Sequence, residues 1–117
     1  MAYVDGFVAP VSPDKRDAYR ALSEQAAKVF LDHGATRVVE TWGDDVPHGK
    51  RTDFHRAVQA GEGETVVFSW IWWPSKEARD AGNARVMADP RMNPGEGMPF
   101  DGRRLIHGGF DVMLDAG

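Results

Sequence analysis

The segment from Thr65 to Trp73, which reads TVVFSWIWW, constrains the fold more than any other part of the sequence. It consists almost entirely of β-branched and aromatic residues, which favour strands, and Pro74 ends it. Successive side chains of a strand point to opposite faces of a sheet. One face would carry Val66, Phe68, Trp70 and Trp72, and the other Val67, Ile71 and Trp73, with Ser69 between them. A sheet with one wet face would alternate apolar and polar residues, so both faces of this strand need cover.

The order of the remaining elements predicts a ferredoxin-like fold. Strands are expected at 3–9, 35–42, 65–73 and 105–114, and a weaker extended segment is expected at 54–60. Helices are expected at about 13–33 and about 76–88, where Ser12 and Ser75 provide the start signals. This order is the α+β, ferredoxin-like βαββαβ arrangement, an antiparallel sheet with two helices on one face. We expect residues 1–117 to form a single such domain.

The second apolar face of this sheet must be covered by something other than the two helices. A second copy of the chain, packed sheet to sheet, is the simplest cover, because obligate homodimer interfaces resemble a domain core. The alternative is that the irregular loop 91–103 folds over this face. We therefore expect a homodimer.

Composition excludes several classes of protein. The chain has 117 residues, with 14 Lys and Arg against 18 Asp and Glu, and its net charge of −4 argues against a nucleic-acid partner. It has no cysteine, which excludes disulfides, thiolate catalysis and Cys-ligated zinc. It has neither a long apolar run nor the pattern of a signal peptide, so we expect a cytoplasmic protein that does not enter a membrane.

Six short motifs carry a resemblance to a known family: YVDGF at 3–7, GDDVP at 43–47, TVVFSW at 65–70, MADPR at 87–91, MPFDG at 98–102 and GGF at 108–110. Together they span nearly the whole chain and resemble the YbaA-like family of small bacterial proteins, a domain of unknown function. The resemblance implies the dimeric α/β-barrel superfamily, in which two ferredoxin-like subunits press their sheets together. That superfamily includes cofactor-free monooxygenases, haem-handling enzymes, lactone isomerases and simple binding proteins. The family has no established activity, so no catalytic residue carries over.

Ionisable residues in the first and last strands form a candidate catalytic site. Asp5 lies among apolar neighbours, where a carboxylate is costly unless it is paired. His107 and Asp111 share one face of the last strand, and Gly109 between them leaves room. The first and last strands are neighbours in ferredoxin-like sheets, so Asp5 joins this pair and His107 becomes a candidate general base. The alternative is a solvent-facing strand edge or a polar network that holds the dimer in register.

Trp42, Trp70 and Glu40 are the candidate ligand-binding residues. Tryptophans can line an apolar ligand cavity, although aromatic side chains equally dominate cores and interfaces. Glu40 lies in the second predicted strand.

We expect neither a metal nor a cofactor. His48 and His55 bracket a loop that also contains Asp44, Asp45 and Asp53. A metal site needs three or four converging ligands at short spacings, and neither HxH nor HExxH occurs. The glycine-rich segments at 61–63 and 95–97 lack the features of phosphate-binding loops.

Three functions remain open from the sequence. The chain binds a small organic molecule in a cavity beside the sheet, or it is a cofactor-free isomerase or monooxygenase-like enzyme that uses His107 as its base. In the third hypothesis it is a structural or assembly protein with no ligand. The fold alone does not choose among them, because it supports many functions.

Overall fold

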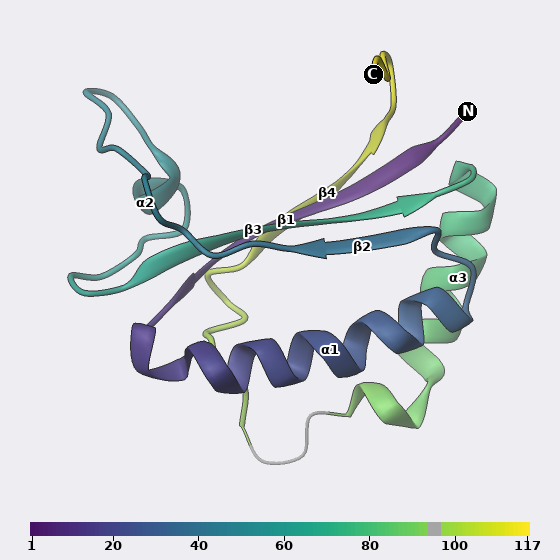
Figure 1. Ribbon diagram of the computed structural model, residues 1–117, viewed down its shortest axis with the longest axis horizontal. Helices are drawn as coiled ribbons and strands as arrows, with labels where there is room; N and C mark the ends of the chain where they lie inside the picture. The colour runs from purple at the N-terminus through teal and green to yellow at the C-terminus, as the bar shows by residue number, and fades with distance from the viewer. Residues whose placement is uncertain (94–96) are drawn as a thin grey trace.

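The computed structural model describes residues 1–93 and 97–117 (Figure 1). Its elements are β1 (Tyr3–Val11), the 3-10 turn η1 (Pro13–Lys15), α1 (Arg16–Asp32), β2 (Arg37–Glu40), α2 (Phe54–Ala57), β3 (Thr65–Trp73), α3 (Lys76–Ala88), the 3-10 turn η2 (Pro90–Met92) and β4 (Ile106–Asp111). The strands form one antiparallel sheet in the order β2-β3-β1-β4. This is the ferredoxin-like βαββαβ arrangement, so the predicted fold class is confirmed. None of the helices in the described part of the chain has the length and apolar character needed to cross a membrane.

Helices α1 and α3 lie on one side of the sheet, and α2 lies on the other (Figure 1). Strands β1 and β3 pair over their whole length, from Tyr3 opposite Trp73 to Val11 opposite Thr65. The odd-numbered residues of both strands face α1 and α3, and the even-numbered residues face the other side. The sequence had predicted this division for β3.

The core between the sheet and the helices is built around Trp73, which is fully buried. Phe30 of α1 meets the Trp73 ring edge-on, with ring centroids 6.1 Å apart. Gly82 of α3 lies against the same ring, and a Cβ atom there would stand 2.3 Å from a carbon of Trp73. A glycine is therefore required for α3 to approach the sheet this closely.

The segment at 54–60 differs from the prediction, because residues Phe54–Ala57 form the single helical turn α2. Asp53 caps this turn by accepting a 2.7 Å hydrogen bond from the backbone N–H of Arg56. The capping interaction supplies a partner for a backbone group that an isolated extended segment would leave to water. Strand β4 also ends earlier than expected, at Asp111, and β2 is shorter than expected.

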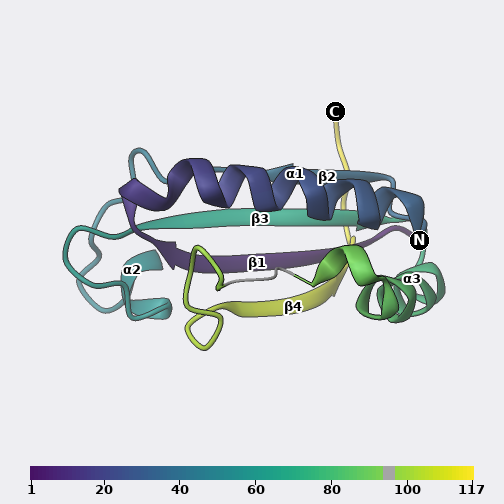
Figure 2. The same cartoon turned by 90° about the horizontal axis from the view of Figure 1, so that it is seen from below.

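The described parts of the 91–103 loop pack on the helix side of the sheet (Figure 2). The Phe100 ring meets the Tyr19 ring edge-on at 5.8 Å between centroids. These parts of the loop therefore do not cover the opposite face.

The face of the sheet turned away from α1 and α3 is apolar and uncovered over most of its area. We call it the open face; its residues are Val4, Gly6, Val8, Phe68, Trp70, Trp72, Ile106 and Phe110. Phe68 is 44% exposed and Phe110 is 59% exposed. Phe54 of α2 touches one end of this face, edge-on to Phe68 at 6.0 Å between centroids.

Candidate functional site

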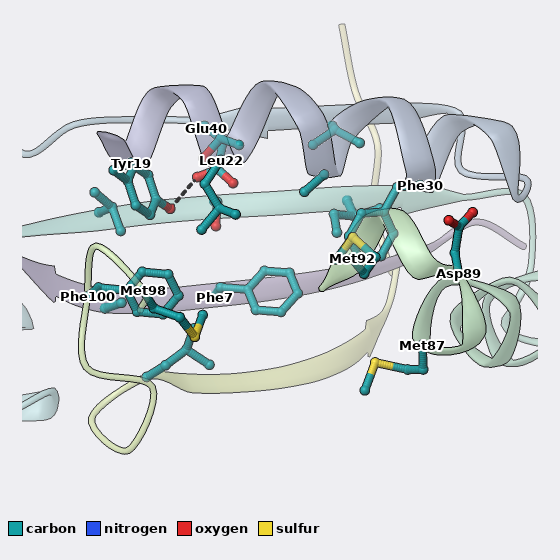
Figure 3. Close-up of a pocket in the computed structure, with 18 of the residues that line it drawn as sticks. Phe7, Tyr19, Leu22, Phe30, Glu40, Met87, Asp89, Met92, Met98 and Phe100 are labelled. Atoms are coloured by element: carbon teal, nitrogen blue, oxygen red, sulfur yellow. Dashed lines mark hydrogen bonds between the residues drawn. The ribbon is translucent and has the colours of Figure 1, made fainter. Parts of the chain in front are cut away.

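A cavity of about 620 Å³ lies between the sheet, α1 and the segment that follows α3 (Figure 3). The sheet provides its floor and α1 forms one wall, while η2 and the end of the 91–103 loop form the other. Its walls are mainly apolar, and its larger side chains include Phe7, Leu22, Phe30, Met92, Met98 and Phe100. Methionine side chains adapt their shape readily, so such walls suit an apolar molecule of irregular outline.

One polar feature of this cavity is a hydrogen bond between Tyr19 and Glu40. Tyr19 lies on the inward face of α1, and Glu40 is the last residue of β2. The Tyr19 hydroxyl donates a 2.6 Å hydrogen bond to Glu40 Oε1 (Figure 3). Ser69 lies opposite Glu40 on β3, and Ser23 lies one helical turn beyond Tyr19, so two further hydroxyls line the cavity close to the carboxylate.

Burial raises the pKa of Glu40 above its ordinary value, although hydrogen bonds from Tyr19, Ser69 and Ser23 oppose the shift. Burial, followed by the negative charge of Glu40, raises the pKa of Tyr19, which therefore stays a neutral phenol. In the described part of the chain, no Lys, Arg or His lies within ion-pair distance of Glu40. Perturbed acids without a structural ion pair are typical of functional sites.

A second hollow, of about 440 Å³, lies on the outer side of the same pair. It shares Tyr19 and Glu40 with the first cavity and is lined in addition by Arg16 and Trp42. Glu40 is nevertheless exposed to solvent as a residue, because its side chain faces both hollows. The Arg16 guanidinium lies over the Trp42 ring, 5.3 Å from its centroid, a cation–π contact.

Of the predicted ligand-binding residues, Glu40 and Trp42 lie at these connected hollows, and Trp70 does not. Trp70 belongs to the open face, where its ring lies 5.4 Å from that of Phe68. This face contains a shallow hollow of about 570 Å³, and its lining is almost wholly apolar.

Asp5 is held by a structural ion pair. Its carboxylate is buried and accepts a bidentate interaction from Arg79 of α3, with the shortest distance, from Nη2 to Oδ1, at 2.8 Å. The indole N–H of Trp73 donates a further 3.0 Å hydrogen bond to Oδ2. Arg79 also lies over the Tyr3 ring, 5.2 Å from its centroid. These contacts engage both carboxylate oxygens and tie α3 to the sheet.

His107 and Asp111 lie on the edge strand β4, where both are exposed. His107 stands opposite Phe7, with ring centroids 6.3 Å apart, and Asp111 stands opposite Tyr3. Among the described residues, no hydrogen bond joins His107 to Asp5 or to Asp111. His107 lies at the rim of the open-face hollow.

Three possible metal ligands, His48, Asp53 and His55, offer ligand atoms within 4.8 Å of one another. His55 Nδ1 is buried and has no hydrogen-bond partner among the described residues. However, the two imidazoles stack nearly parallel at 4.4 Å, so their nitrogens do not point at a common centre. Asp53 accepts hydrogen bonds from the backbone of Gly49 and Arg56, and these interactions lower its pKa. This arrangement does not fit a metal ion without reorientation of the rings.

The comparison with known proteins identifies the family. A family model described as "Protein of unknown function (DUF1428)" matches residues 2–102. The chain is 59% identical to the uncharacterized protein YbaA of Escherichia coli strain K12, over 98% of this chain and 99% of that protein. The chain belongs to this family. The same identity and coverage relate it to the uncharacterized YbaA of Shigella flexneri.

Solved structures show the fold of this DUF1428 protein in more distant chains. A mutant of SnoaB, described as a cofactor-independent oxygenase from Streptomyces nogalater, matches with a TM-score of 0.56 and 13% identity, covering 97% of this chain and 95% of that chain. Rv0793 from Mycobacterium tuberculosis matches with a TM-score of 0.51 and 17% identity over the full length of both chains.

The sequence did not point to Tyr19, Ser23 and Ser69 as candidate site residues. Tyr19 falls within the helix expected at about 13–33, and Ser69 interrupts an otherwise apolar strand. Their polarity could have revealed them, because a phenol or hydroxyl group at an inward position needs a hydrogen-bond partner. Glu40 is that partner for Tyr19, but the pairing spans 21 residues and depends on how α1 packs across β2.

Proposed function

We propose that this DUF1428 protein binds a small, largely apolar organic molecule in the cavity between the sheet and α1. The observation that carries the proposal is a mainly apolar cavity of about 620 Å³ with a hydrogen-bonded polar pair, Tyr19 and Glu40, at its edge. Ligand sites typically combine these features: a concave apolar volume of this size and a few placed polar atoms.

The site also indicates the chemistry of the ligand. The apolar body would contact Phe7, Phe30 and Phe100, and a hydroxyl, phenol or carbonyl group would face Tyr19 and Glu40. The negative charge of Glu40 disfavours a phosphate or carboxylate at that position.

A neutral fluorescent probe, N-phenyl-1-naphthylamine, tests this proposal. Ala26 lines the cavity on α1, so Ala26→Phe should fill part of the volume and weaken probe binding at least about tenfold. Ala21 lies on the exposed side of the same helix, so Ala21→Phe is the matched control and should bind the probe as the original chain does. Equal binding by all three proteins would show that the probe does not use this cavity.

The second candidate is a cofactor-free isomerase or monooxygenase-like enzyme. Two observations favour it: a carboxyl of raised pKa beside an apolar cavity, and the likeness in fold to SnoaB, which is described as a cofactor-independent oxygenase. The sequence suggested His107 as its base. His107 lies at the rim of the open face, so under this hypothesis we place the base at Glu40.

We also propose that a second copy of the chain covers the open face. The support is the area of apolar surface left exposed around Phe68, Ile106 and Phe110, which is unusual for a chain that remains a monomer. Two such faces are complementary by symmetry, because a two-fold axis pairs the same surface patch on both subunits. A purely structural role, the third hypothesis, would keep this interface and show no probe binding in the cavity.

A further inference from the structure

We propose that Glu40 acts as a general base, removing a proton from a carbon or oxygen acid bound in the cavity. This inference rests on the proposed binding function and adds to it a substrate class: an enolisable carbonyl compound or a phenol. Such a ligand has an apolar body for the cavity and an acidic C–H or O–H next to a polar group.

The position of Glu40 suits this role. It stands where the apolar cavity meets the outer hollow, so one side of the carboxylate borders the ligand volume and the other borders solvent. Tyr19, Ser69 and Ser23 donate hydrogen bonds to the carboxylate, which has about four acceptor positions, so capacity remains for a substrate proton. An abstracted proton then has a path to water through the outer hollow.

The surroundings keep the carboxylate basic. No cation of the described residues pairs with it, whereas a salt bridge would weaken it as a base. The charged groups that face it come from α1: Arg16, Arg20 and Glu24 line the outer hollow. Strand β3 contributes the Ser69 hydroxyl, and Asp89 lies at the far end of the cavity (Figure 3). Tyr19 stays neutral and holds the carboxylate in place, which makes it a positioning residue.

The reaction balances without a cofactor. A proton moves from a carbon beside the carbonyl group to Glu40, and the electrons of that C–H bond pass to the carbonyl oxygen as an enolate. Return of the same proton to a different carbon of the conjugated system gives an isomer, and the carboxylate is regenerated. No oxidant or reductant takes part.

The probe 5-nitrobenzisoxazole tests for such a base without knowledge of the substrate. When a base removes its ring C–H proton, the electrons of that bond form the nitrile as the N–O bond breaks, and the opened ring is a coloured phenolate that carries the nitrile. A positioned base typically contributes 10²–10⁴-fold, so we expect Glu40→Gln to lower the rate at least about tenfold. Glu77→Gln, at an exposed acid on α3, is the matched control and should leave the rate unchanged.

A pH profile separates the roles of Glu40 and Tyr19. The rate should rise with pH through an inflection above the ordinary glutamate range, because burial raises the pKa of Glu40. Tyr19→Phe removes a hydrogen bond that favours the charged carboxylate, so the inflection should move to higher pH. A merely structural role of Tyr19 would lower the amount of folded protein without moving the inflection.

Two outcomes would overturn the inference while leaving the binding proposal intact. In the first, 5-nitrobenzisoxazole displaces N-phenyl-1-naphthylamine, yet Glu40→Gln and the original chain convert it equally fast. In the second, the original chain is no faster than acetate at the same concentration. If Glu40→Gln fails to fold, Glu40→Asp keeps a carboxylate but withdraws it from the cavity, and it should also be slower. Failure of the fluorescent probe to bind would instead refute the proposed function.

Discussion

Glu40 and His107 stand at the two ends of one row of residues that crosses the helix-facing side of the sheet. Glu40 on β2 pairs with Ser69 on β3, Ser69 pairs with Phe7 on β1, and Phe7 pairs with His107 on β4. Two strands therefore separate the acid from the imidazole, and the ring of Phe7 lies between the cavity and His107. The row places the polar group of the cavity at the β2 edge rather than at the β4 edge.

His107→Ala is expected to leave both stability and probe binding nearly unchanged. The ring is exposed and its recorded contact is with Phe7, so its loss should change the free energy of unfolding by about 0.5 kcal/mol or less. Urea unfolding and titration with N-phenyl-1-naphthylamine check the two expectations. If the folded variant bound N-phenyl-1-naphthylamine more weakly, His107 would belong to the ligand-binding site.

The Asp5–Arg79 pair is expected to stabilise the fold strongly. Among the described residues, Arg79→Met leaves the buried carboxylate with the Trp73 N–H as its remaining partner. Breaking a buried pair in this way typically costs about 3–5 kcal/mol. Adding Asp5→Asn to the same chain removes the uncompensated charge and should restore part of the loss. Urea unfolding of both single variants and the double variant measures this coupling. Additive losses would show that the two groups do not depend on each other.

The sequence was sufficient to predict the architecture because its signals are local. The two-faced pattern of Thr65–Trp73 and the start signal at Ser75 recur in β3 and α3 as expected, and Ser75 caps α3 by accepting a hydrogen bond from the Ala78 N–H. The helix at Phe54–Ala57 was missed because its stabilising signal is a single capping aspartate in a segment with weak apolar periodicity.

The candidate site was predictable only in part. The sequence singled out Glu40 and Trp42, which line the hollows, but not the partner of Glu40, because Tyr19 reaches it only through the packing of α1 on the sheet. Asp5 was expected to join His107 because ferredoxin-like topology makes β1 and β4 neighbours, which they are. The sequence did not reveal that Arg79 of α3 lies over Gly109 and engages Asp5, since nothing local links positions 5 and 79.

The open face is expected to form the subunit interface. At micromolar concentration, light scattering should give about twice the chain mass of 12.9 kDa, because an obligate interface survives such dilution. Phe110→Asp places a charge on the β4 side of this face, where the Phe110 side chain is exposed, and should give a monomer. Met113→Asp is the control, because Met113 is 93% exposed and lies beyond the end of β4. A monomeric original chain would contradict the interface.

Glu40→Gln is expected to stabilise the protein at neutral pH. The pKa of Glu40 is raised on folding, so the folded state binds this proton more tightly than the unfolded state does. The contribution of Glu40 to stability is therefore fully present below the unfolded pKa of about 4.3 and is lost as pH rises through the folded pKa. Above that value the charged carboxylate opposes folding, and the neutral amide removes this cost.

Thermal melting of the original chain and of Glu40→Gln across the pH range tests this sign. The variant should melt a few degrees higher at pH 7, an increase kept small because the accessible side of the carboxylate is solvated, and the two curves should converge near pH 4. Glu77→Gln should show no such convergence, because Glu77 is exposed on α3. Residues that serve activity often lower the stability of the fold, so a more stable Glu40→Gln agrees with a functional role for Glu40. A less stable Glu40→Gln would show instead that Glu40 stabilises the fold.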